Sequence, residues 1–97
     1  MEKVYIVLEE SYNLLADENG ASYIYGCYDT KEKAIDKAIE MINVSLEDDW
    51  VLDENDLEDY NSNPRKFVSE SYARTFWKYQ ENWAYYSEIS VKELEVK

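Results

Sequence analysis

Alternating apolar residues near the N-terminus predict a β-strand. Apolar side chains fall on both sides of the extended chain, with Val4, Ile6 and Leu8 on one side and Tyr5 and Val7 on the other. β-Branched and aromatic residues suit a pleated, packed surface. Because both sides are apolar at the centre of the segment, we place this strand inside a sheet.

A turn and a second strand follow. Residues 17–20 end in Asn-Gly, a pair that readily takes positive φ and predicts a turn. Residues 21–28 then predict a strand that runs antiparallel to the first. Gly26, inside this second strand, indicates a bulge or a close approach of another chain segment.

The clearest predicted element is an amphipathic helix over residues 29–42. Its apolar residues recur at helical spacing, at Ala34, Ile35, Ala38, Ile39 and Ile42. Asp29, with Glu32 three residues later, resembles a capping box, and Thr30 is the alternative N-cap. Asn43 is the expected stop.

The apolar stripe of this helix needs a partner surface. We expect the helix to pack on one face of the sheet, with its isoleucines buried against one side of the first strand. The expected contacts join Ile35, Ile39 and Ile42 to Val4, Ile6 or Leu8.

The chain after residue 63 allows two interpretations. Asn63 as a cap and Pro64 at the first helical position would start a helix. Residues 72–79, however, are dense in aromatic and β-branched residues, which favours a strand. We favour a short helix or irregular stretch near Pro64, followed by a hairpin of two long strands.

The last strand shows a slip in its alternation. Ile89 and Val91 share one side, whereas Leu94 and Val96 follow in the other phase, which suggests a bulge near residues 92–93. Together the elements predict an α+β fold, with an antiparallel sheet of about four strands and one main helix packed on one face. A length of 97 residues predicts a single domain, 1–97.

Charge is distributed unevenly along this chain. The net charge is −12, yet no lysine or arginine occurs between Ala38 and Pro64. Within this gap, an acidic segment at 46–60 holds eight carboxylates in 15 residues: Glu47, Asp48, Asp49, Asp53, Glu54, Asp56, Glu58 and Asp59. These eight are the candidate partner-binding residues.

The acidic segment approaches the charge density of nucleic acid. As a continuous helix it would span about 22 Å, at roughly 1.5 Å per residue. Duplex DNA carries one charge per roughly 1.7 Å, and a single strand about half that density. The segment lies between the two, so a basic protein groove would meet it as it meets phosphate. A solvated, charge-rich loop is the alternative interpretation.

The usual chemistry of enzymes is missing from the sequence. Histidine is absent, and the two glycines form no phosphate-binding loop. Cys27, the single cysteine, reads as a small buried residue rather than a nucleophile. The acidic segment fails the helix–loop–helix calcium pattern, because Glu58 stands where glycine is required. We therefore expect no enzyme, no cofactor and no metal.

The ten tyrosines suggest a second function, because Tyr and Trp are enriched at protein interfaces. Filling of a small core is the alternative role for them. Direct nucleic-acid binding is not expected, since the phosphates would be repelled. The apolar run at 4–8 is too short for a signal peptide or a membrane span, so we expect no membrane partner and a cytoplasmic protein.

Two sequence runs carry a resemblance. KVYIVLEE at 3–10 and YIYGCYDTKEKA at 23–34, with the alternating C-terminal strand, resemble small uncharacterised accessory proteins of bacteriophages and mobile elements. The resemblance covers about half of the chain, and the acidic segment lies outside it. It implies a phage or host setting, in which acidic inhibitors of CRISPR and restriction enzymes, several of them DNA mimics, are analogues.

From these observations we expect an acidic inhibitor that blocks a basic nucleic-acid-binding protein, such as a CRISPR or restriction enzyme. The alternative is a phage or host structural or assembly protein with an aromatic interface. Self-association is compatible with either function.

Overall fold

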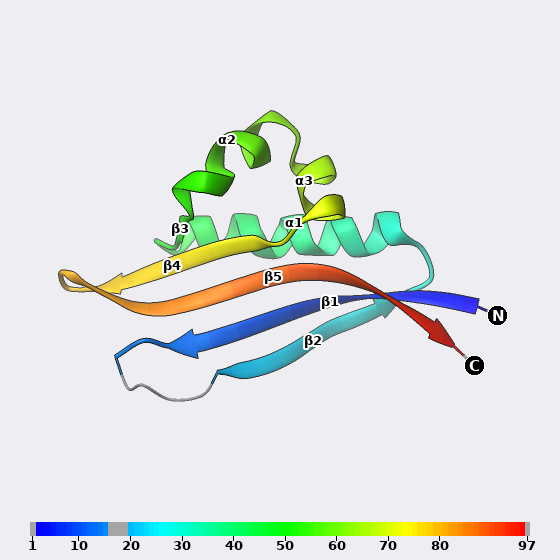
Figure 1. Ribbon diagram of the computed structural model, residues 1–97, viewed down its shortest axis with the longest axis horizontal. Coiled ribbons are helices and arrows are strands. Elements are labelled where there is room, and N and C mark those ends of the chain that lie inside the picture. The colour runs from blue at the N-terminus through cyan, green and yellow to red at the C-terminus, as the bar shows by residue number, and fades with distance from the viewer. Residues whose placement is uncertain (1, 16–19, 97) are drawn as a thin grey trace.

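The computed structural model describes residues 2–15 and 20–96 and contains one antiparallel sheet in the order β2-β1-β5-β4-β3. The strands are β1 Glu2–Asn13, β2 Ala21–Tyr28, β3 Val51–Leu52, β4 Ala73–Tyr79 and β5 Asn82–Val96. The helices are α1 Lys31–Glu47, α2 Glu54–Ser62 and α3 Pro64–Glu70. Figure 1 shows α1 lying along one face of the sheet, with α2 farther from the sheet than α1.

The predicted α+β class with an antiparallel sheet is confirmed, but the element count differs. The described chain has five strands and three helices, where about four strands and one main helix were expected. The extra strand, β3, is two residues long and pairs with β4, with Val51 opposite Phe76. Two residues are too few to produce a readable alternation, so this strand left no sequence pattern.

β1 is an interior strand of the sheet, as predicted, and lies between β2 and β5. The predicted irregularity at Gly26 is also confirmed. Gly26 has a φ of +91°, and the β1–β2 pairing shifts by one residue between Ile6 and Leu8. Of the predicted turn at 17–20, residues 17–19 lie outside the described residues.

α1 begins where one of the two predicted caps places it. The Thr30 hydroxyl accepts a hydrogen bond from the backbone N–H of Lys33, so Thr30 rather than Asp29 is the N-cap. The predicted stop at Asn43 is wrong, because the helix continues to Glu47. Asn43 stays helical while its side-chain oxygen accepts a hydrogen bond from the Tyr60 hydroxyl at 2.9 Å.

The main core lies between α1 and the sheet, but the predicted partner side of β1 is wrong. Ile35 and Ile42 are buried and Ile39 is partly buried, facing Val7 and Ile89 rather than Val4, Ile6 and Leu8. Residues of alternate parity face opposite sides of a strand. Val4, Ile6 and Leu8 therefore lie on the side of the sheet away from α1, which we call the open face.

The chain after Asn63 follows the favoured interpretation. α3 is a short helix with Pro64 at its start, and β4 and β5 form the expected hairpin of long strands. The predicted bulge at residues 92–93 is wrong, because the β1–β5 pairing is continuous there. The irregularity lies instead at Trp77 and Lys78. Leu94 is apolar because it lies on the open face opposite Val4, without any slip in register.

Candidate functional site

The acidic segment at 46–60 forms the end of α1, a turn, β3 and most of α2 rather than one helix. Its first carboxylate ends α1, Asp48 and Asp49 make the turn that follows, and the rest belong to the start and body of α2. Asp49 has a φ of 69°, a left-handed conformation that aspartate tolerates better than most residues. A continuous charged rod of about 22 Å is therefore wrong.

Three of the candidate carboxylates gather at the C-terminal end of α1. Glu47, Asp48 and Asp49 are exposed there, and the last turn of the helix contains no basic residue. A helix C-terminus carries partial negative charge, so carboxylates at this end destabilise the helix. The chain thus keeps three like charges where they oppose folding.

α2 presents further carboxylates to solvent. Glu54 and Glu58 lie one helical turn apart and are exposed, as is Asp59 beside them. The opposite side of α2 faces the rest of the molecule through the buried Tyr60, whose ring meets Phe67 of α3 edge-on at 6.0 Å. α2 is therefore held by one side and exposes its acids on the other.

Two of the eight candidate residues serve the fold instead. The Asp53 carboxylate caps α2 by accepting a hydrogen bond from the backbone N–H of Asn55 at 2.9 Å. The buried Asp56 carboxylate accepts two hydrogen bonds from the guanidinium of Arg74 in β4. This bidentate hydrogen bonding holds the pKa of Arg74 above its already high ordinary value. Asp56 thus forms an internal ion pair, and its charge is not exposed to a partner.

The remaining six carboxylates form what we call the acidic surface. None of them makes an ion pair with a basic side chain of residues 2–15 or 20–96. All six are exposed: Glu47, Asp48, Asp49, Glu54, Glu58 and Asp59. The structure thus brings six of the eight candidate residues to solvent and separates Asp53 and Asp56 from them.

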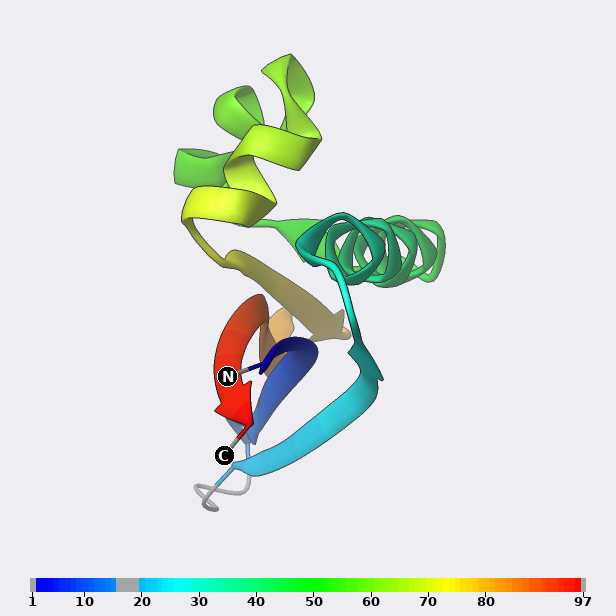
Figure 2. The ribbon, with the colours of Figure 1, turned by 90° about the vertical axis from the view of Figure 1, so that its right-hand side faces the viewer.

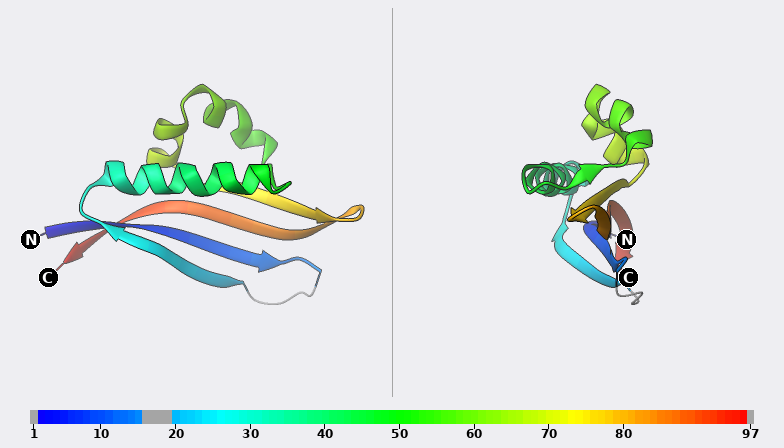
Figure 3. Two further views of the ribbon diagram at one scale, coloured as in Figure 1. Left: turned by 180° about the vertical axis from the view of Figure 1, so that it is seen from behind. Right: turned by 90° about the vertical axis from the view of Figure 1, so that its left-hand side faces the viewer.

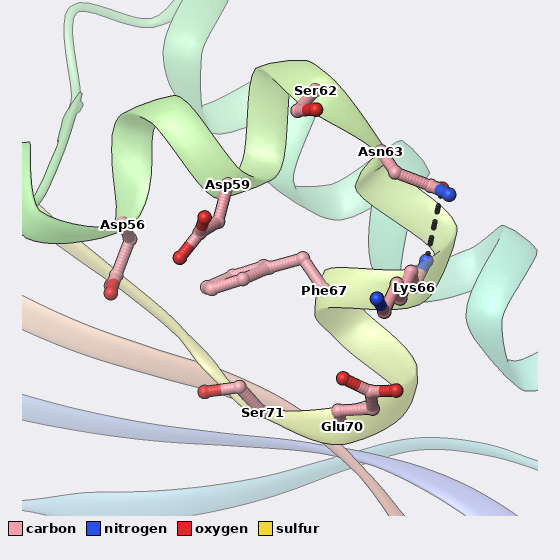
Figure 4. A pocket seen from close by; sticks show the side chains of 8 residues that line it. All are labelled: Asp56, Asp59, Ser62, Asn63, Lys66, Phe67, Glu70 and Ser71. Atoms are coloured by element: carbon pink, nitrogen blue, oxygen red, sulfur yellow. Dashed lines mark hydrogen bonds between the residues drawn. The ribbon is translucent and has the colours of Figure 1, made fainter.

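A hollow of about 460 Å³ opens between α2 and α3 and adds a carboxylate that the sequence analysis missed. Figure 4 shows Asp59 and Phe67 turned toward this hollow and Glu70 at its lower rim. Lys66 is the cation among the lining residues. Glu70 lies outside the lysine-free gap, so charge patterning could not find it. Glu70 could have been found from the helix start at Pro64, because a helix that begins there folds back beside α2.

An aromatic cluster lies on the open face near the β4–β5 hairpin. Phe76 contacts Trp83 at 5.5 Å and Tyr86 at 4.9 Å between ring centroids, and Tyr86 stacks on Tyr12 at 5.8 Å. The ammonium of Lys78 lies 4.5 Å from the centre of the Trp83 ring. Trp83 is 43% exposed, so this cluster is partly open to a partner.

The aromatic cluster and the acidic surface meet at a second hollow. This space of about 350 Å³ is lined by Phe76 and Trp83 on one side and by Asp53 and Glu54 on the other. An aromatic face beside carboxylates is a favourable environment for a guanidinium or ammonium group. The geometry therefore suits a basic side chain from another molecule.

Other chemistry is sparse in the part of the chain that the structure describes. Cys27 is exposed, so its expected burial is wrong; it lies on the edge strand β2. No group of three histidine, cysteine, aspartate or glutamate side chains could hold a metal ion among these residues. None of the described helices is both long and apolar enough to cross a membrane.

Comparison with protein-family models, curated proteins and solved structures finds no match to this chain. The resemblance to phage accessory proteins therefore stays a prediction.

Proposed function

We propose that the protein is an acidic binding protein that covers a basic, nucleic-acid-binding surface of a partner protein, such as a CRISPR or restriction enzyme. One observation carries the proposal. The fold neutralises Asp56 with Arg74, yet leaves the six carboxylates of the acidic surface exposed and without basic partners among the described residues. Three of them, Glu47, Asp48 and Asp49, also oppose folding at the C-terminal end of α1, and such unpaired charge is best explained by a partner that supplies the opposite charge.

Two features support recognition of a basic side chain in particular. Asp59 and Glu70 line the hollow between α2 and α3, so a lysine or arginine entering it would find carboxylates on more than one side. Glu54 and Trp83 line the second hollow, where a guanidinium could pair with the carboxylate and stack on the indole. The partner is thus a protein with several exposed lysines or arginines.

The same charges argue against other functions. A phosphate backbone would be repelled by the acidic surface, so direct nucleic-acid binding is not part of the proposal. Catalysis is not part of it either, because the chain contains no histidine and the buried carboxylate is held by Arg74. We propose a phage or mobile-element setting on the resemblance of the two sequence runs, and a cytoplasmic location because a single cysteine can form no internal disulfide.

The test is a pull-down from bacterial lysate with the immobilised protein, followed by elution with duplex DNA. Bound proteins that DNA displaces, and that higher salt releases, support phosphate mimicry. In a matched variant, all six carboxylates of the acidic surface are changed to Gln or Asn. This variant should capture none of the proteins that DNA displaces from the wild type. If the neutralised variant captures the same proteins as wild type, the proposal fails.

Charge loss in general has to be separated from loss of this surface. Two double variants each remove two exposed carboxylates. The first combines Glu54→Gln with Glu58→Gln in α2. The second combines Glu81→Gln in the β4–β5 turn with Glu95→Gln in β5. The first pair should weaken capture, whereas the second should leave it nearly unchanged.

The second candidate function is a structural or assembly protein that binds through the aromatic cluster. The observation favouring it is the exposed indole of Trp83, set beside Phe76 and Tyr86 on the open face. Such an interface would depend little on salt, and Trp83→Ala would weaken it at every ionic strength.

A further inference from the structure

β2 is an unprotected edge of the sheet. It stands at one end of the strand order, and Figure 2 shows it at the free rim of the sheet, away from α3. Its eight residues include no charged residue and no proline, and seven of them are exposed. Sheet edges normally carry lysine, proline or very short strands, because unpaired backbone N–H and C=O groups recruit further strands. The opposite edge, β3, follows this pattern with two residues.

The sequence of β2 is self-complementary about Ile24. Tyr23 and Tyr25 flank this residue, and the next two residues in each direction are small: Ser22 and Ala21 before, Gly26 and Cys27 after. A two-fold interface requires a surface that matches itself, with residue i opposite j and j opposite i. Reversing β2 about Ile24 places Tyr23 opposite Tyr25 and Ser22 opposite Gly26, whereas the bulge at Gly26 takes Cys27 out of this register.

The first ten residues of α1 are balanced in charge, unlike the whole chain, although Glu9 and Glu10 of β1 lie opposite Tyr23 and Ser22 of β2. α1, which follows β2 directly, carries three lysines and three acids in its first ten residues, a net charge of zero: Lys31, Glu32, Lys33, Asp36, Lys37 and Glu40. The acidic surface belongs to the other end of α1 and to α2. None of the six carboxylates of the acidic surface is among the residues that line the hollow beside Tyr25, where the charged residues are Glu9, Lys37 and Glu40.

We propose that two copies of this chain pair through β2, antiparallel and about a two-fold axis at Ile24. The two sheets then join into one sheet of ten strands, five from each copy. Ile24, 66% exposed and the most exposed of the large apolar residues described, meets its own counterpart on the open face. Tyr23 lies opposite Tyr25 of the second copy on the face that carries α1. This pairing does not depend on the proposed function.

A hollow beside the strand suits this arrangement. Tyr25 lines a space of about 330 Å³ with Met41 and Val44 of α1, and Val44 is 51% exposed. The side chain directly opposite Tyr25 in the proposed pairing has its Cβ about 4.5–5.5 Å away, so Tyr23 of the second copy comes to the mouth of this hollow. The bulge at Gly26 confines regular pairing to the residues nearest Ile24.

Sedimentation across a concentration series tests the proposal. Wild type should dimerise, and added salt should strengthen the dimer by screening the repulsion between two chains of net charge −12. Ile24→Lys should raise the dimer Kd by about tenfold or more, because two like charges would face each other on the axis. Leu94→Lys makes the same change on the open face of the interior strand β5 and should leave dimerisation in place. Circular dichroism checks that both variants fold.

Disulfide trapping tests the register of the pairing. It gives a result even if the lysine variant does not fold, because it uses different substitutions. With the axis at Ile24, Ile24→Cys in a Cys27→Ser background links to itself, and Tyr23→Cys combined with Tyr25→Cys in the same background links the pair that flanks the axis. These two pairs have opposite hydrogen-bonding types, so one of them has the closer Cβ geometry that a disulfide needs. Wild-type Cys27 alone should give no linked dimer. A chain that stays monomeric up to about 1 mM, or a dimer that Ile24→Lys leaves intact, overturns the proposal. Linkage of wild-type Cys27 to itself overturns the register.

Discussion

Arg74 and Asp56 join the sheet to α2 through two hydrogen bonds, from Nε to Oδ2 at 3.1 Å and from a terminal guanidinium nitrogen to Oδ1 at 2.9 Å. The Asp56 side chain is 9% exposed and that of Arg74 is 33% exposed. This pair and the Tyr60–Asn43 hydrogen bond anchor the helix that carries half of the acidic surface. The position of those carboxylates therefore depends on an internal ion pair rather than on the charges themselves.

Breaking this ion pair should destabilise the protein more than breaking an exposed ion pair would, because Asp56 is buried. Asp56→Ala should lower the free energy of unfolding by about 1–3 kcal/mol, because Arg74 loses its partner while Asp56 leaves a buried gap. Arg65, which pairs with the exposed Glu32 and Asp36, is the control, and Arg65→Met should cost less than about 1 kcal/mol. Urea melts measure both. Equal costs would contradict the anchoring role.

The two faces of α1 should differ sharply in their sensitivity to truncation. Ile42 is fully buried between α1 and the sheet, so Ile42→Ala should cost about 2–5 kcal/mol. Val44, two residues later, is 51% exposed, and Val44→Ala should be nearly neutral. The same urea melts test the pair. A large loss at Val44 would mean that its side chain is covered, for instance by a second copy of the chain.

Alkaline pH should unfold the protein partly through Tyr86. Burial raises the pKa of this phenol above its ordinary value, and its 2.6 Å hydrogen bond to the Glu88 carboxylate raises it further. The folded state therefore keeps a proton that the unfolded state loses above about pH 10, so stability falls as pH rises through that region. Tyr86→Phe should flatten this decline in thermal melts across the alkaline range. An unchanged slope would show that other groups dominate.

The sequence predicted an element best where its apolar residues fall on a single face. The stripe of Ala34, Ile35 and Ala38 predicts α1 because a helix packed by one face needs that period, and all three are buried. The side of β1 that faces α1 could not be predicted, because both sides are apolar. Val7 is fully buried and Ile6 nearly so, on opposite faces of the same strand.

The candidate site was predicted only in part, for an electrostatic reason. Charge counting finds every carboxylate in the lysine-free gap, but it cannot see a cation that arrives from elsewhere in the fold. Arg74 lies in β4, 18 residues from Asp56 along the chain, and removes it from the acidic surface. Glu70 comes to the hollow between α2 and α3 in the same way, through the packing of two helices.

Views from behind and from the opposite side show the two helix ends that carry the acidic surface, the C-terminal end of α1 and the start of α2, at different heights above the sheet (Figure 3). The charge of the acidic surface is therefore spread over the end of α1, the turn after it and α2 rather than along one rod. Each helix has its own dipole, and each carboxylate acts on the fold according to the helix end at which it lies.

Removing one carboxylate should therefore change stability with opposite signs at the two helix ends. Glu47 lies at the negative C-terminal end of α1, so Glu47→Gln should raise the free energy of unfolding by about 0.3–1 kcal/mol at low salt. Glu54 lies in the first turn of α2, where negative charge is favourable, so Glu54→Gln should lower it by a similar amount. Under the proposed function both substitutions weaken partner binding, so Glu47→Gln should give a more stable but weaker inhibitor. Thermal melts in low and high salt measure the first effect, and competition with duplex DNA measures the second. Glu47→Gln could instead stabilise the protein without weakening capture. That result would show that Glu47 destabilises the fold and has no role in binding. The C-terminal end of α1 would then no longer belong to the proposed binding surface.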